Sequence, residues 1–272
     1  MTVARDLTRR KARERSGLFV AEGIRTVEEL LASPLRITRA LTCDLLDRTP
    51  RGVALESALR ARGVDVERVD ETDFRSASAT EHTQGVLAIA ERPDTGLGGL
   101  SLSDDASVGA NGTTAGETAP LRLLILDGIQ DPGNAGTLLR TAAAFGVAAT
   151  VALPGTVDLW NAKVVRSAVG MQFRRPTINS TGSALWPFLR ERGIVLWGAD
   201  ATGTPVDDLR RVGTLPHRLA LVVGNEGAGL SGDVREACEA LVSLPMASGA
   251  ESLNVAVAAG VLLFALRPSP LL

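Results

Sequence analysis

Apolar runs of strand length alternate with amphipathic segments over the first third of the chain. The runs LFVAEG, ITRALTC and GVLAIAE are short and apolar, and VDVERVD is a weaker run of the same kind. IRTVEELLAS and ALESALRARG have apolar residues three and four apart, which is helical spacing. The pattern predicts a small α/β domain over residues 1–92, opened by a basic helix.

A second series of apolar runs begins after residue 120 with LRLLILDGI, VAATVAL, GIVLWGAD and RLALVVGNE. Each is rich in Val, Leu and Ile and is followed by a helical or turn-rich segment, which is typical of a parallel sheet covered by helices on both faces. We therefore expect an α/β domain with a mostly parallel sheet over residues 121–272. Its last element, SLNVAVAAGVLLFALR, is apolar nearly all round, which predicts a helix buried in a core or against another subunit.

The segment between these regions differs in composition. Residues 93–120 are rich in Gly, Ser, Thr and Ala and contain four acidic residues but no Lys or Arg. So little apolar surface does not support a core. The sequence therefore predicts a flexible linker at 93–120.

Charge and cysteine content narrow the class of protein. The net charge is only -2, so binding to nucleic acid requires a local basic surface. One candidate is Arg5–Arg15, with six cations and two acids. The two cysteines and two histidines are scattered, which indicates neither a disulfide framework nor a metal site. No apolar run is long enough to span a membrane and the N-terminus lacks a signal-like segment, so we expect a soluble cytoplasmic protein.

The loop GNEGAGLSG, residues 224–232, contains the pattern G-x-G-x-x-G after an apolar strand. A dinucleotide-binding fingerprint opens the first strand–helix unit and needs further strands after it, but only 40 residues follow this loop. No Lys-Ser or Lys-Thr pair follows the glycines, which excludes a Walker-type phosphate loop. Taken alone, the glycines are best explained by a structural turn, in which they supply positive φ angles and close backbone approach.

Two other segments place polar residues at helix starts. In LDGIQDPGNAGTLLRTAAAFG, Asn134 is suited to cap a helix and Gly146 to end it, while Arg140 lies on the polar helix face. In LVSLPMASGAESLNVAVAAG, Ser252 is a candidate N-cap for the last helix. Capping and solvation account for these residues when each segment is considered alone.

The three segments together carry a more specific signal. DPGNAGTLLRTAAAFG, VVGNEGAGLS and LPMASGAESLNVAVA occur in this order and resemble the three motifs of the SpoU (TrmH-type) family of the SPOUT superfamily. FVAEGIRTVEELL, after the Arg-rich helix, resembles the substrate-binding domain that often precedes that catalytic domain. The resemblance covers nearly the whole chain outside the linker.

This resemblance implies a methyltransferase that uses S-adenosylmethionine to methylate RNA at the ribose 2′-oxygen. It also implies a deep trefoil knot in the C-terminal domain and a homodimer that packs through the last helix. A dimer of this type assembles its active site from both subunits. The residues that match the cofactor-binding positions are Gly224, Leu244, Met246, Ser252 and Leu253, with Ala201 and Thr202 expected to line the adenosine pocket.

Methyl transfer requires an in-line arrangement and loss of a weakly acidic hydroxyl proton. The groups expected there are Asn134, Arg140, Glu226, Ser252 and Asn254. The family assigns the motif arginine to activation of the 2′-hydroxyl, but a guanidinium is almost never neutral in a protein. Our hypothesis is that Arg140 grips a neighbouring phosphate and stabilises the developing oxyanion, while Glu226 orients Arg140 or Asn134.

The expected substrate is ribosomal RNA, because the pairing of domains resembles ribosomal RNA enzymes more than the short tRNA enzymes. The alternatives are a tRNA 2′-O-methyltransferase and a non-catalytic RNA-binding knotted protein. No metal ion is expected to take part. The residues expected to contact RNA are Arg5, Arg9, Arg10, Lys11, Arg13, Arg166 and Arg174.

Overall fold

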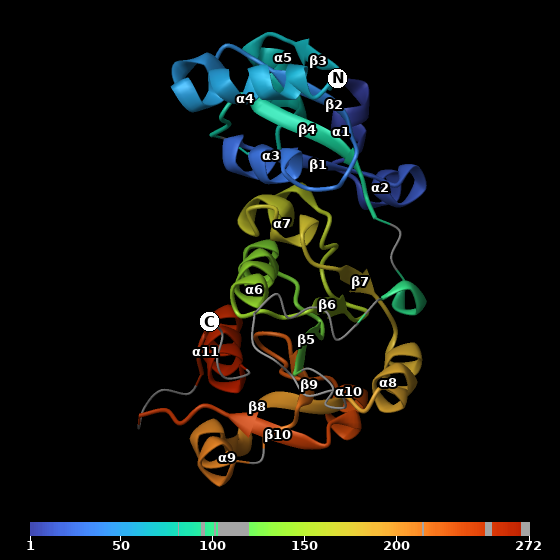
Figure 1. The fold of residues 1–272 in the computed structure, drawn as a ribbon, viewed down its shortest axis with the longest axis vertical. Coiled ribbons are helices and arrows are strands. Elements are labelled where there is room, and N and C mark those ends of the chain that lie inside the picture. The colour runs from blue at the N-terminus through green and yellow to red at the C-terminus, as the bar shows by residue number, and fades with distance from the viewer. Residues whose placement is uncertain are drawn as a thin grey trace, which may run out of the picture. The chain divides into compact units, whose positions relative to one another are not determined.

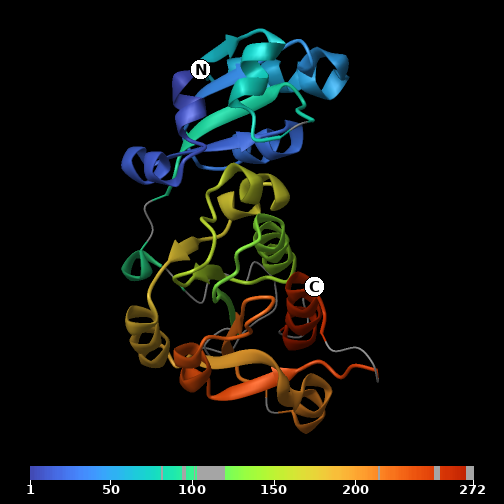
Figure 2. The same ribbon diagram turned by 180° about the vertical axis from the view of Figure 1, so that it is seen from behind.

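A computed structural model of the chain divides it into two compact units. The first unit comprises residues 1–94 and 158–174, and the second comprises 95–157 and 175–272. Figure 1 and Figure 2 show the elements of each unit from opposite sides. The structure describes residues 1–80, 82–93, 96–100, 102, 120–213, 215–247 and 252–267. Most of the predicted linker at 93–120 lies outside these ranges.

The first unit is built on a four-stranded sheet in the order β1-β4-β2-β3. Its strands are β1 (Leu18–Glu22), β2 (Ile37–Thr42), β3 (Val66–Arg68) and β4 (Val86–Glu91). The β4 strand runs antiparallel to both β1 and β2, whereas β2 and β3 are parallel. The helices are α1 (Thr2–Asp6), α2 (Arg10–Ser16), α3 (Ile24–Leu31), α4 (Pro50–Ala61), α5 (Glu71–Ala77) and α7 (Ala162–Ser167), with 3-10 turns η1 (Leu46–Arg48) and η4 (Met171–Phe173).

The core of this unit includes a segment that is distant in sequence. Phe19 of β1 packs against Trp160 and Phe173, with ring centroids 4.6 and 5.5 Å away. All three side chains are buried in one apolar cluster with residues of α3 and β4. Residues 158–174 therefore complete the core of the first unit, although the sequence analysis assigns them to the domain at 121–272.

The second unit contains a six-stranded sheet in the order β10-β8-β9-β5-β6-β7, in which every adjacent pair is parallel. The strands are β5 (Leu121–Leu126), β6 (Ala149–Ala152), β7 (Thr177–Asn179), β8 (Val195–Pro205), β9 (Arg218–Val223) and β10 (Ala240–Ser243). Every residue of β5 is buried, as expected for a central strand covered on both faces. The mostly parallel α/β sheet predicted from the apolar runs is confirmed.

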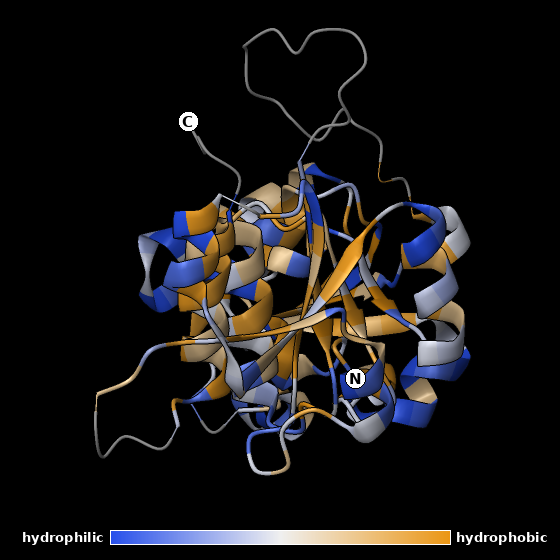
Figure 3. Cartoon of the chain, turned by 90° about the horizontal axis from the view of Figure 1, so that it is seen from below, coloured by the Kyte–Doolittle hydropathy of each residue, from blue (hydrophilic) through white to orange (hydrophobic). Residues whose placement is uncertain are grey.

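Helices and one short turn accompany this sheet. They are η2 (Leu97–Gly99), α6 (Pro132–Ala144), α8 (Gly182–Glu191), α9 (Val206–Val212), α10 (Gly232–Ala237) and α11 (Val255–Leu266). In Figure 3 the hydrophobic colour is concentrated on the strands, while the helices carry many hydrophilic positions. Short elements such as α5 and β7 have no counterpart among the predicted elements.

Candidate active site

Three loops of the second unit meet where strands end. The β5 strand leads into α6, β9 leads into the glycine loop at 224–231, and β10 leads toward α11. Because β5 and β9 are parallel neighbours, their carboxyl ends lie at the same edge of the sheet. Asp127, which follows β5, is buried there and its Oδ2 accepts a 2.7 Å hydrogen bond from the backbone N–H of Ser231. This contact ties the first loop to the second.

A chain of side-chain hydrogen bonds joins all three motif segments. Asn254 Nδ2 donates to Asn134 Oδ1 at 3.0 Å, and Asn134 Nδ2 donates to Glu226 Oε1 at 2.6 Å. Each residue comes from a different motif, separated by 92 and 120 positions along the chain. The carboxylate of Glu226 therefore fixes the orientation of Asn134, whose carbonyl oxygen in turn orients Asn254.

Two capping predictions are wrong. The N-cap of α6 is Asp131, whose Oδ1 accepts from the backbone N–H of Asn134 at 2.7 Å, with Pro132 at the first helical position. The N-cap of α11 is Asn254, whose Oδ1 accepts from the N–H groups of Ala256 and Val257 at 3.0 and 3.3 Å. Neither predicted residue occupies an N-cap position, because Asn134 lies within the first turn of α6 and Ser252 lies two residues before the cap of α11.

The glycine loop is held in shape by Asn225. Its Oδ1 accepts from the N–H groups of Gly227 and Ala228, both at 3.0 Å, and its Nδ2 donates to the carbonyl oxygen of Gly128 at 2.9 Å. At Gly224 the backbone of the loop turns back so closely that an added Cβ would lie 2.5 Å from Leu230 N. The glycine is therefore required by close backbone approach, not by a left-handed conformation.

A cavity of about 160 Å³ opens beside this loop. Six of the seven predicted cofactor positions line it, namely Gly224, Leu244, Met246, Ser252, Leu253 and Ala201. Further lining comes from Val223, Glu226, Val255 and Leu262. Met246 and Leu253 are 36% and 46% exposed, which is unusual for apolar side chains of this size and leaves apolar surface at the cavity for a ligand to cover. The cavity thus combines main-chain groups with an apolar lining.

The seventh predicted position, Thr202, is not among the lining residues and instead supports one of them. Its backbone N–H and hydroxyl both donate to Asp200, at 2.9 and 2.6 Å. Arg235 forms an ion pair with the same carboxylate. Burial alone would raise the pKa of Asp200, but the hydrogen bonds from Thr202 and Arg235 outweigh it and lower the pKa. Asp200 is therefore held in its ionised form at the cavity, with its charge balanced by Arg235.

Arg140 lies on the exposed face of α6 and does not line the cavity. Within the ranges that the structure describes, its guanidinium forms no hydrogen bond or ion pair with this chain. Its donors are thus free to bind an external acceptor.

The sequence profile of the SpoU rRNA Methylase family matches residues 122–264, which span all three loops. The chain belongs to this family. The profile of the MRM3-like substrate binding domain matches residues 3–88, most of the first unit. The family resemblance stated from the motifs is thereby confirmed.

Other SpoU proteins resemble this chain over most of their length. The 23S rRNA (guanosine(2553)-2′-O)-methyltransferase RlmP of Bacillus subtilis is 32% identical, over 95% of this chain and 92% of its own. The 23S rRNA (guanosine-2′-O-)-methyltransferase RlmB of Xanthomonas campestris is 34% identical, over 89% and 93%. The AdoMet-bound rRNA methyltransferase of Sinorhizobium meliloti has a similar fold, with a TM-score of 0.76, 26% identity and coverage of 98% and 93%.

The basic residues expected to contact RNA fall into two groups in this SpoU protein. Arg9, Arg10, Lys11 and Arg15 surround a shallow surface hollow on α2, and Lys11 and Arg15 form no ion pair with any residue that the structure describes. Arg5 is paired with Asp73, Arg174 with Glu29, and Arg166 lies 3.9 Å from Glu22. Arg9 and Arg10 pair with Asp6 and Glu14, so Lys11 and Arg15 are the side chains at this hollow most available to a polyanion.

Arg13 does not lie on the surface as predicted. It is 2% exposed and pairs with Asp158 at 2.6 Å, while its Nη1 donates to the carbonyl oxygens of Leu7 and Thr8. Its side chain thus has a structural role in the first unit. The sequence did not indicate this, because Asp158 is 145 positions away.

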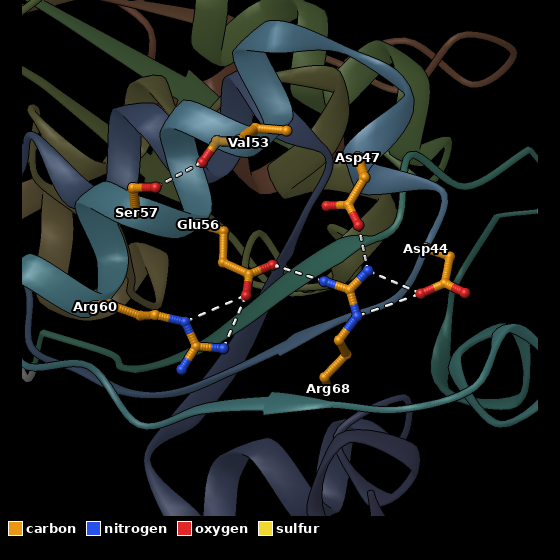
Figure 4. Close-up of polar contacts among 7 residues, drawn as sticks. All are labelled: Asp44, Asp47, Val53, Glu56, Ser57, Arg60 and Arg68. Atoms are coloured by element: carbon orange, nitrogen blue, oxygen red, sulfur yellow. Dashed lines mark hydrogen bonds and ion pairs between the residues drawn. The ribbon is translucent and has the colours of Figure 1, made fainter.

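A second arginine of the first unit also forms ion pairs with acidic residues. Arg68 of β3 is surrounded by Asp44, Asp47 and Glu56, and Glu56 also accepts from Arg60 (Figure 4). The hydrogen bonds from Arg68 to Asp47 and Asp44 raise the pKa of its guanidinium. Since its charge is balanced, Arg68 contributes little to a basic surface.

The described ranges hold neither a candidate metal site nor a candidate membrane-spanning helix. No group of three His, Cys, Asp or Glu side chains that could hold a metal ion is present there. No helix in those ranges is both long and apolar enough to cross a membrane.

Proposed function

We propose that this protein transfers a methyl group from S-adenosylmethionine to a ribose 2′-oxygen of ribosomal RNA. The observation that carries the proposal is the hydrogen-bond chain from Asn254 through Asn134 to Glu226. It joins the three motif loops beside a cavity whose lining includes Glu226. The relatives named as 23S rRNA guanosine-2′-O-methyltransferases, and the AdoMet in the related structure, support both the reaction and the cofactor.

The lining of the cavity suits S-adenosylmethionine in its chemistry. At Gly224 the loop has no room for a side chain, so its main-chain groups are presented without one in front of them. A cofactor held by backbone contacts requires this arrangement. Leu244, Met246 and Leu253 offer apolar surface for the adenine ring, and Asp200 offers a carboxylate to a polar end. We assign these residues, together with Ala201 and Ser252, to cofactor binding.

Methyl transfer from S-adenosylmethionine makes two demands on the protein. S-adenosylmethionine supplies an electrophilic methyl group on a sulfonium, so the ribose oxygen must be held in line and lose its proton as the new bond forms. Arg140, always charged and free of partners in the described ranges, would grip the phosphate beside the target ribose and stabilise the developing negative charge on O2′. Asn134 and Asn254, fixed by Glu226, would position the ribose.

The first unit is the proposed RNA-binding unit. Its match to a substrate binding domain and the basic surface of α2 at Arg9, Arg10, Lys11 and Arg15 support this role. Binding through phosphates should weaken steeply as salt increases. Ribosomal RNA is favoured over tRNA because the relatives listed above are named for 23S rRNA and match the chain over both units.

We also propose a homodimer that packs through α6 and α11. Val257, Val261 and Phe264 are 53%, 46% and 49% exposed and recur on one face of α11, which is costly for a helix in water. Phe264 also meets Phe145, just beyond α6, edge to face, with ring centroids 5.8 Å apart. Arg140 is exposed on α6, so a second copy that covers this face would contact its side chain. This supports an active site completed by both subunits.

The resemblance to SPOUT enzymes further supports a trefoil knot in the second unit. A ribosomal RNA substrate supports a cytoplasmic location.

Calorimetric titration tests the cofactor assignment. S-adenosylmethionine should bind with one site per chain, and NAD should give no saturable heat. Saturable binding of NAD without binding of S-adenosylmethionine would replace the methyltransferase with an oxidoreductase.

A further inference from the structure

The second unit contains a cavity at the opposite edge of its sheet from the candidate active site. It is lined by residues that precede β5 and β9 or begin β5, and by residues of α9 and the end of α11, with a volume of about 290 Å³. Since β5 and β9 are parallel, this edge lies one strand length from the loops that carry Asn134 and Gly224. The cavity is therefore separate from the cofactor site.

The lining of this cavity has one sign of charge. It includes Arg122, Arg210, His217 and Arg267, and the other lining residues are Pro120, Leu215, Pro216 and Ala265. No Asp or Glu belongs to the lining in the described part of the chain. A hollow with one sign of charge and low-dielectric walls concentrates its field on a bound counter-ion.

Arg122 is a buried cation without an acidic partner. It is 7% exposed, and it donates only to backbone carbonyls: Nε to Leu266 at 2.6 Å, and Nη1 to Leu121 and His217, both at 2.8 Å. Its Nη2 forms no hydrogen bond with any residue that the structure describes, and Arg122 lines the cavity. Burial lowers the pKa of this guanidinium to about 10, so three carbonyl oxygens do not fully compensate its desolvation.

The other two arginines of the lining differ in the contacts that they already make within the chain. Arg267 donates to the carbonyl oxygen of Phe264 and stacks over its ring, 3.6 Å from the centroid, which fixes its position at the end of α11. Arg210 is exposed on α9 and forms no ion pair in the described ranges, whereas its neighbour Arg211 pairs with Asp208 at 3.2 Å. Arg210 is thus free to close on a ligand.

We propose that this cavity binds a phosphate group, held by Arg122 from within and by Arg210, His217 and Arg267 at its mouth. Guanidinium groups match phosphate oxygens with paired, charge-assisted hydrogen bonds. The charge of the lining selects the ligand: three arginines and a histidine, with no Asp or Glu in the described part of the chain, suit a diphosphate. The phosphate is either that of a small polyphosphate or one of an RNA backbone. Neither depends on the methyl-transfer proposal.

Calorimetric titration with inorganic pyrophosphate at constant ionic strength tests the site. The whole protein should bind it saturably, Arg210→Ala should weaken binding about tenfold, and Arg211→Ala, its matched control, should bind as the unchanged protein does. His217→Gln should also weaken binding. Arg122 is not the variant of choice, because its loss would also release the end of α11. Absence of saturable binding, or equal effects of Arg210→Ala and Arg211→Ala, would overturn the proposal.

Two further titrations complete the test. An unmethylated ribosomal RNA fragment added as competitor should displace pyrophosphate if the site holds an RNA backbone phosphate, and should leave it bound if the site serves a small polyphosphate. S-adenosylmethionine should bind to Arg210→Ala with unchanged affinity, because the two cavities share no lining residue. If pyrophosphate binds but S-adenosylmethionine does not, the phosphate site stands and the methyltransferase proposal fails.

Discussion

Asn254 donates a hydrogen bond from Nδ2 to Oδ1 of Asn134 while its own Oδ1 caps α11. One side chain thus starts the last helix and holds the first motif loop in place. Its two functions use different atoms, so they can be separated by substitution.

Asn254→Asp keeps an oxygen for the cap but loses the Nδ2 donor, and it brings a second carboxylate toward the Asn134–Glu226 pair. We expect a free energy of unfolding within about 0.5 kcal/mol of the unchanged protein and a methylation rate lower by about 10²-fold. Asn254→Ala should lose both functions and cost about 1 kcal/mol of stability as well. Urea unfolding and single-turnover methylation measure the two effects. Equal activity of Asn254→Asp and the unchanged protein would show that the contact with Asn134 is not needed.

Gly224 and Gly227 lie in one loop but differ in the space around them. A Cβ at Gly224 would lie 2.5 Å from Leu230 N, whereas a Cβ at Gly227 would have Asn225 Oδ1 as its nearest neighbour at 3.7 Å. Gly224→Ala should therefore displace the loop and weaken S-adenosylmethionine binding by at least about tenfold. Gly227→Ala is the control and should bind the cofactor normally in the same titration. If both variants bind equally well, the loop does not form the cofactor wall.

Substitution of Arg140 tests whether methyl transfer requires the planar guanidinium group or only a positive charge. We expect Arg140→Lys and Arg140→Ala both to lower the rate constant for methyl transfer by about 10²-fold or more. S-adenosylmethionine binding should be unchanged in both, because Arg140 does not line the cavity of its own chain. Retention of most activity by Arg140→Lys would reject the bidentate grip on phosphate and leave a simple charge effect.

Arg13 and Arg15 are neighbours on α2 with opposite environments, the former buried against Asp158 and the latter exposed. Arg13→Ala leaves Asp158 buried without its cation and should cost about 3–5 kcal/mol of unfolding free energy in the first unit. Arg15→Ala should change stability by less than about 0.5 kcal/mol but weaken RNA binding and lower its dependence on salt.

The fluorescence of Trp160 reports on the first unit if Trp186 and Trp197 are replaced by Phe, since the chain has three tryptophans. Urea unfolding of Arg13→Ala and Arg15→Ala in that background compares the two. Similar stability of both variants would contradict the structural role given to Arg13.

The sequence predicted those features that depend on local pattern. The buried strands of the second unit are near-continuous apolar runs, so β5, β8 and β9 were found and their parallel arrangement followed from the helices between them. By contrast, β7 has only three residues, Thr177–Asn179, and too little apolar content to stand out. The segment at 158–174 joins the first unit through long-range packing of Trp160 and Phe173, which no local pattern encodes.

The site was predicted at the level of motifs and not of hydrogen bonds. Asp131 and Asn134 are both good capping residues, three positions apart, and only the backbone geometry decides which of them caps α6. Asn225 and Asp127, which shape the loops, were missed although each follows a strand of the parallel sheet, where functional residues gather. Polar residues at strand ends were the available signal.

Methylation of a ribose 2′-oxygen of ribosomal RNA by this protein would leave a modified nucleotide that can be detected in the cell. The direct measurement is mass-spectrometric mapping of 2′-O-methyl nucleotides in ribosomal RNA from cells with the gene, cells without it, and cells that carry Asn134→Ala instead. We predict that one 2′-O-methyl nucleotide disappears on deletion, returns with the unchanged gene, and stays absent or strongly reduced with Asn134→Ala. An identical set of 2′-O-methyl nucleotides in all three would show that this protein does not methylate ribosomal RNA.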